Sequence, residues 1–132
     1  MHPYTNYFTV SKYNKGVRDF FKNDYPKLYL LSGSQITTKI NSKDKSRVGY
    51  YWNIFAVTWL TINRLEDTPQ LPYRTIIVEH CINHVTIKDI VNTYKHSGSW
   101  GTNRKNEALK KFAEIFKQEQ IKNKVYPLLE FE

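Results

Sequence analysis

Two stretches in the second half of the chain most constrain its fold, because their apolar residues recur at helical spacing. Side chains at i, i+3, i+4 and i+7 lie on one face of an α-helix. The first stretch supplies Ile87, Ile90, Val91 and Tyr94, and the second supplies Leu109, Phe112, Ala113 and Phe116. The pattern predicts two amphipathic helices in sequence.

The ends of these helices are also marked. Thr86, with Asp89 three residues later, approximates a capping box, and Gly98 is a typical stop signal. We expect the second helix to begin near Asn103 or Arg104 and to run to about residue 121. The prediction is a basic helix-loop-helix unit over 86–122, followed by a short extended tail over 123–132.

The rest of the chain predicts mixed structure. Residues 11–24 fit a short helix with Ser11 as N-cap, which Pro26 should end by residue 24. Residues 27–31 and 35–40 fit two short strands around a Ser-Gly-Ser turn. The run 48–62 fits a helix ending near residue 65, with a buried strand as the alternative. Residues 73–80 fit a strand or a helix. We therefore predict one α+β domain over 1–132, with three to four helices and a short antiparallel hairpin or sheet.

Composition limits the class of protein. The chain has 132 residues and 15% aromatic residues, enough for a core without disulfides. One cysteine excludes an internal disulfide and favours a reducing compartment. The N-terminus shows no signal-peptide pattern, and the longest apolar run, 48–62, is too short to span a membrane. We expect a cytoplasmic protein, in a host cell or in a virion if the protein is viral.

The net charge of +8 is unevenly distributed. Residues 1–48 hold nine Lys or Arg against three acids, and residues 84–125 hold nine against four. The part between them is nearly neutral and apolar. Two basic blocks attract an anionic polymer such as nucleic acid. The alternative is that the charge serves only solubility.

The candidate contact residues lie mainly around the expected loop. The segment from residue 95 to residue 105 has no carboxylate, and hydroxyl groups, cations and a helix N-terminus are what a phosphate backbone requires. Two lysines on the outer face of the second helix and a basic loop at 39–47 extend this surface. The candidates are Lys95, Ser97, Ser99, Trp100, Thr102, Arg104, Lys105, Lys111, Lys122, Lys43, Lys45 and Arg47.

Trp100 has two interpretations. An exposed tryptophan could stack on a base, which is worth about 1–3 kcal/mol. A buried one would anchor the loop on the core, as tryptophan is well buried on average. Both interpretations remain open at the level of sequence.

The layout of residues 86–122 resembles a helix-turn-helix or winged-helix DNA-binding unit. The turn of that family normally has three to four residues, whereas the expected loop over 97–102 is longer and carries two glycines. This departure favours contact of the loop with the DNA backbone over insertion of the second helix into a groove.

Residues 79–84, Glu-His-Cys-Ile-Asn-His, are the one cluster of metal-ligand types in the sequence. His80 and His84 would share a helical face, but no third ligand follows, so packing or surface roles are favoured over a metal site. No phosphate-binding glycine motif is present. We predict no cofactor and no enzymatic activity.

These observations favour a non-catalytic protein that binds duplex DNA through phosphate contacts, encoded by a phage or a mobile element. The alternative is a protein-interaction module, either a virion component or an inhibitor of a host protein, that uses an aromatic surface. A protein partner or a homo-oligomer is compatible with both.

Overall fold

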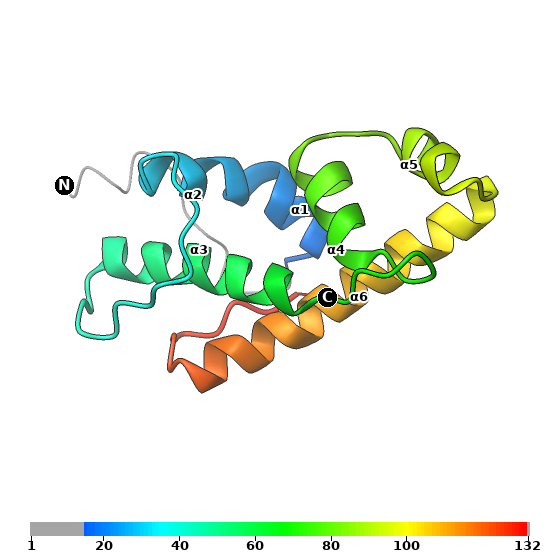
Figure 1. The fold of residues 1–132 in the computed structure, drawn as a ribbon. Coiled ribbons are helices and arrows are strands. Elements are labelled where there is room, and N and C mark those ends of the chain that lie inside the picture. Colours follow the sequence, from blue (N-terminus) through cyan, green and yellow to red (C-terminus); the bar gives the residue numbers. More distant parts are fainter. Residues whose placement is uncertain (1–14, 132) are drawn as a thin grey trace.

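The computed structural model describes residues 15–131, and the regular structure in that part of the chain is helical (Figure 1). A single isolated β-bridge joins Asp67 and Pro72. The predicted α+β class is therefore wrong, because neither the hairpin nor a sheet forms among the described residues. The Ser11 N-cap lies outside them.

The first helix continues through the proline that was expected to end it. Helix α1 (Val17–Asp19), the π-helical segment η2 (Phe20–Asp24) and α2 (Tyr25–Leu31) follow one another without a break. Tyr25 keeps helical dihedrals, and its N–H donates to the carbonyl of Phe20, five residues back. The wider π turn directly precedes Pro26, which lies in the first turn of α2, so the change in hydrogen-bond pattern falls where proline has no N–H to donate. The predicted helix end at 24 and the predicted strand at 27–31 are both wrong.

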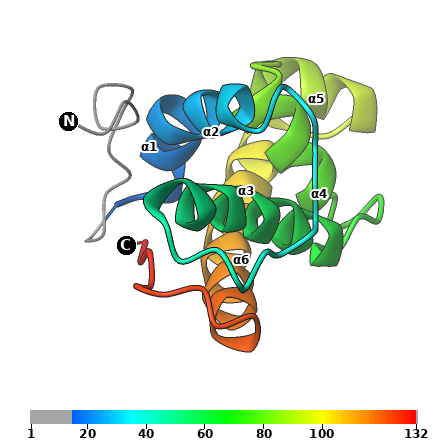
Figure 2. The same cartoon turned by 90° about the vertical axis from the view of Figure 1, so that its left-hand side faces the viewer.

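The second predicted strand, 35–40, has no regular structure. This segment passes beside α3 (Arg47–Arg64) (Figure 2). Side chains of α3 bind its backbone. Asn53 accepts from the N–H of Asn41 at 2.7 Å and donates to its carbonyl at 3.0 Å. Trp52 donates to the carbonyl of Lys39 at 3.0 Å. Side chains of a helix thus take the place of a partner strand, and the predicted strand at 35–40 is wrong.

The predicted helix over 48–62 is confirmed as α3. Ser46 caps its first turn by accepting from the N–H of Gly49 at 3.1 Å. At its other end, Arg74 donates to the carbonyls of residues 62, 63 and 65 at 3.2, 2.9 and 3.1 Å. These bonds supply donors to carbonyls at the C-terminal end of α3, where donors from a following helical turn are missing. Arg74 itself lies in α4 (Tyr73–Ile76), which continues as the π-helical segment η3 (Ile77–Ile82), so the ambiguous stretch 73–80 is helical.

The predicted helix-loop-helix is present, but its loop is shorter than expected. Helix α5 (Ile87–Tyr94) has Thr86 as its N-cap, accepting from the N–H of Asp89 at 3.2 Å, as predicted. Helix α6 (Gly98–Lys122) begins at Gly98 rather than near 103, because Ser97 caps it by accepting from the N–H of Trp100 at 3.2 Å. Lys95, in the left-handed conformation, ends α5. The connection is therefore residues 95–97, and Gly98 starts a helix instead of stopping one.

Helix α6 is at the centre of the packing. It contacts α1, α3, α4, η3 and α5. On its inner face, Phe112 lies 5.0 Å from Phe21 and Phe116 lies 5.9 Å from Phe20, measured between ring centroids. Phe131 of the tail completes the cluster, 4.9 Å from Phe116. Both ends of the described chain thus meet on α6.

The tail is non-helical after α6, as predicted, and is fastened to that helix. The buried side chain of Gln120 donates to the carbonyl of Leu129 at 2.9 Å and accepts from its N–H at 2.8 Å. Glu130 in turn accepts from the N–H of Lys15 at 3.1 Å. These bonds hold Phe131 against the aromatic cluster.

Gly101 allows the close approach of α5 to α6, and its substitution tests the arrangement. A Cβ at Gly101 would overlap methyl groups of Val91 and Ile87, whereas a Cβ at Gly98 would meet no atom within 4 Å. Because overpacking costs about 1–3 kcal/mol, Gly101→Ala should lower the free energy of unfolding by roughly that amount in urea denaturation. Gly98→Ala, the matched control on the same helix, should change it by less than about 1 kcal/mol. Equal effects of the two substitutions would contradict this packing.

Candidate functional site

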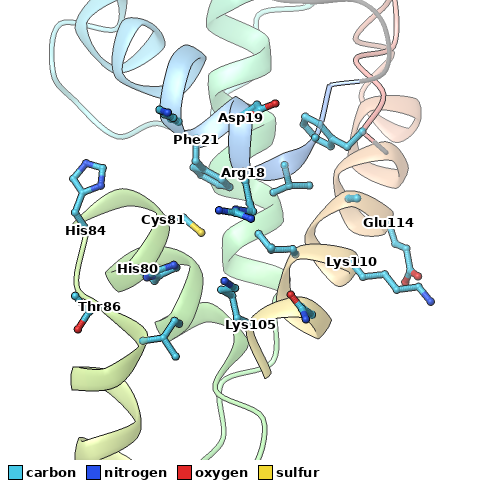
Figure 3. Close-up of a pocket in the computed structure, with 18 residues that line it drawn as sticks. Arg18, Asp19, Phe21, His80, Cys81, His84, Thr86, Lys105, Lys110 and Glu114 are labelled. Atoms are coloured by element: carbon cyan, nitrogen blue, oxygen red, sulfur yellow. The ribbon is translucent and has the colours of Figure 1, made fainter. Parts of the chain in front are cut away.

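A hollow lies between the first helix, η3 and the middle of α6 (Figure 3). Its volume is about 1250 Å³. The start of α5 and Phe131 of the tail close its sides. We call this hollow the α6 groove.

Four cations border the α6 groove: Arg18, Lys22, Lys105 and Lys110. None of the four forms an ion pair with a carboxylate among the described residues. Two acids also line the groove, Asp19 and Glu114, and Glu114 is paired with Lys111 at 3.7 Å. The groove therefore carries an excess of uncompensated positive charge.

Arg18 and Lys105 point toward the same part of the groove from different helices, on either side of Cys81 (Figure 3). Burial raises the pKa of Cys81 to about 11, and the positive charges of Lys105 and Arg18 oppose this rise. A thiol with a raised pKa is a poor nucleophile at neutral pH. Cys81 therefore lies at the centre of the groove as a neutral group.

His80 and His84 do not lie on one helical face, as their spacing in the sequence would allow. His80 directs Nδ1 at the carbonyl of Val85, 2.8 Å away, so this nitrogen carries the hydrogen. His84 lies beyond η3 with a positive φ of 63°, so its side chain does not follow the helical period. Among the described residues, no group of three potential metal ligands comes together.

Helix α6 separates the predicted contact residues onto two flanks. At 100° per residue, Ser99 and Thr102 share the flank of Lys105 and Lys110, which faces the α6 groove. A second set lies on the opposite flank. These residues are Trp100, Arg104, Lys111 and Lys122.

Most of the charge on the second flank is compensated. Arg104 pairs with Glu107 at 3.2 Å, and Glu107 also accepts from the hydroxyl of Tyr73 at 2.7 Å. Burial and this bond raise the pKa of Tyr73 to about 12. Lys111 pairs with Glu114 across the helix surface. Lys122, in the last turn, is exposed and has no ion-pair partner among the described residues.

Trp100 is neither fully exposed nor part of the main core. Its ring stacks on His96, with centroids 4.1 Å apart and planes 10° apart. Tyr94 lies 5.8 Å away, and the guanidinium of Arg104 lies 5.9 Å from the ring centroid. Trp100 therefore packs against side chains of its own α5–α6 turn. The flanking residues Lys95, Ser97 and Ser99 are exposed.

The second predicted surface, with Lys43, Lys45 and Arg47, lies at the other end of the molecule from the α5–α6 turn (Figure 1). Lys43 and Lys45 are exposed, and Arg47 begins α3. The loop is ordered by Asp44, which accepts from the N–H of Ser46 at 2.9 Å. The structure thus does not join this loop and the turn into one surface.

Arg18 and Lys22 were missed by the sequence analysis. They are four residues apart on the exposed face of the first helix, so periodicity alone places them on its outer side. Their importance comes from η3 and α6 lying opposite that face, which no local pattern reveals.

Comparison with protein-family models, with curated proteins and with solved structures finds no match for this chain. Among the described residues, no helix is both long enough and apolar enough to cross a membrane.

The raised pKa of Cys81 gives a direct test of the groove geometry. A pKa near 11 instead of 9 leaves about a hundredfold less thiolate at pH 8. Alkylation of the folded protein by iodoacetamide should therefore be slow and should keep rising up to pH 10. The urea-unfolded chain should react faster, reach half of its maximal rate near pH 9 and level off from about pH 10, whereas the folded protein should still gain about tenfold in rate between pH 9 and pH 10. A folded-state rate that also reaches half of its maximum near pH 9 would contradict the burial described here.

Proposed function

We propose that this protein binds nucleic acid without catalysis, and that it holds duplex DNA through phosphates along the groove-facing flank of α6. The observation that carries the proposal is the set of four cations around the α6 groove that have no partner among the described carboxylates. Cations without a local counterion are available to neutralise phosphates and to release the counterions of DNA.

The N-terminal part of α6 extends this surface. Ser99, Thr102 and Asn106 are exposed, and by helical period they lie on the same flank as Lys110. Small hydroxyl and amide groups are common donors to phosphate oxygens. Between Ser97 and Lys105 the helix rises by about 12 Å, so a phosphate backbone can reach both the turn and the groove.

The geometry favours phosphate contact over reading of bases. In the first two turns of α6, Gly101 faces α5, Trp100 stacks on the turn, and Arg104 is tied to Glu107. Few long side chains remain free there to reach base edges. The connection over 95–97 has the length typical of a helix-turn-helix unit, and the proposal does not require insertion of α6 into a groove of the DNA.

The alternative, a protein-interaction module with an aromatic surface, receives less support. Among the described tyrosines and tryptophans only Tyr126 is exposed, and the others are buried or half-buried. The other large apolar residues that are well exposed are Leu30, Ile36 and Ile121.

A salt titration of binding to duplex DNA tests the proposal. The logarithm of the binding constant should fall linearly with the logarithm of salt concentration. Arg18→Gln with Lys105→Gln should make the slope shallower by about 1.8, since each lost phosphate contact removes about 0.9. Fluorescence anisotropy with a labelled duplex provides the measurement.

The matched control is Lys43→Gln with Lys45→Gln, which removes the same charge at the other end of the molecule. This pair should leave the slope nearly unchanged. An equal loss in both variants would mean that total charge, and not the α6 groove, determines binding. Absence of binding by the unaltered protein at low salt would end the proposal.

A further inference from the structure

The centre of the α6 groove has more positive charge than is required to neutralise one internal phosphate of a DNA strand. Arg18 and Lys105 converge there from α1 and α6, and they are the charged groups that influence Cys81 (Figure 3). Glu114 lies at the edge of the groove, away from Arg18 and Lys105 (Figure 3), and is paired with Lys111. Two cations meet at one point, and neither has an ion-pair partner among the described residues.

Two neighbouring cations match the charge of a phosphate monoester. An internal phosphodiester carries one negative charge, whereas a monoester carries about 1.5 to 2 near neutral pH. A guanidinium can bind two oxygens of such a group, and an ammonium can bind the third. The pair formed by Arg18 and Lys105 therefore fits a terminal phosphate better than an internal one.

The walls beside these cations are apolar. Val17 and Phe21 contribute from the first helix, Leu109 and Ala113 from α6, and Phe131 from the tail. Apolar walls contribute nothing to contacts with a phosphate backbone. They can pack against a nucleoside, because the faces of its base and sugar are largely apolar. The volume, about 1250 Å³, exceeds the roughly 300–1,000 Å³ of ordinary ligand pockets, so a nucleotide and the strand that continues from it can both be accommodated.

We propose that the α6 groove binds a nucleoside 5′-monophosphate group, with the phosphate between Arg18 and Lys105 and the nucleoside against the apolar walls. In a duplex, the bases are stacked and paired, so only the end of a strand offers both parts together. The partner is accordingly the 5′-phosphorylated end of a DNA strand. This inference rests on the proposed DNA-binding function and narrows it to strand ends.

Paired duplexes test this inference. Two DNAs of identical sequence, each with a short 5′ overhang, differ only in carrying a 5′-phosphate or a 5′-hydroxyl group. In anisotropy titrations at physiological salt, the phosphorylated duplex should bind about tenfold more tightly. Lys105→Gln should bring this ratio close to one. Lys122→Gln, a cation of the same helix that lies outside the groove, should preserve it.

Cys81 supplies a second measurement that does not depend on affinity. It is the only cysteine in the sequence and lines the centre of the groove. A 5′-phosphorylated overhang duplex should slow its alkylation, and the 5′-hydroxyl duplex should do so much less. Adenosine 5′-monophosphate alone distinguishes a strand end from a free nucleotide as the ligand. Protection of Cys81 by the duplex, at concentrations where the nucleotide has no effect, supports the strand end. Equal protection of Cys81 by both would assign the site to a free nucleotide and overturn the strand-end partner.

The outcomes also separate this inference from the proposed function. Equal affinity for the two duplexes, with a normal salt dependence, would overturn the strand-end site and leave phosphate-mediated DNA binding intact. Binding of neither duplex at low salt, together with protection of Cys81 by the nucleotide, would overturn DNA binding and retain a nucleotide site.

Discussion

The packing of phenylalanines on the inner face of α6 is the interaction on which the rest of the structure depends. Phe112 and Phe116 meet Phe20 and Phe21 from the first helix and Phe131 from the tail. Aromatic side chains bury large areas and prefer such tilted and edge-on contacts. Because α6 also contacts α3, α4 and α5, this one cluster positions nearly every helix. The contacts of Trp100, by contrast, order only the turn between α5 and α6.

The site is a consequence of the same packing. Once the first helix is held against α6 by Phe20 and Phe21, its exposed face brings Arg18 toward Lys105. Segment η3 closes the space between them and places Cys81 in it. The opposite flank of α6 is different, since Arg104 and Lys111 are compensated by Glu107 and Glu114. One helix thus carries a free cationic flank and a largely compensated one.

Several features could be predicted from local sequence, and others could not. The stripes of α5 and α6 and the Thr86 cap were predicted correctly, because periodicity and capping act within one or two turns. The helix end at Pro26, the strands at 27–31 and 35–40 and the stop at Gly98 were wrong. In the first case a π turn accommodates the proline. The helix then continues through residues 27–31 as α2, which removes the first strand. At 35–40, side chains of Asn53 and Trp52 replace a partner strand, and at Gly98 the Ser97 cap begins a helix.

The sequence by itself determined which residues are charged, which faces of the helices are apolar, and that cations accumulate in two blocks. Only the tertiary structure decided which cations act together. Lys105 and Arg104 are neighbours in sequence, yet one faces the α6 groove and the other is bound to Glu107. Lys105 and Arg18 are far apart in sequence and meet across the groove. The physical reason is that helical period sets the direction of a side chain, whereas its partners are set by which helix packs opposite, and that depends on contacts between distant parts of the chain.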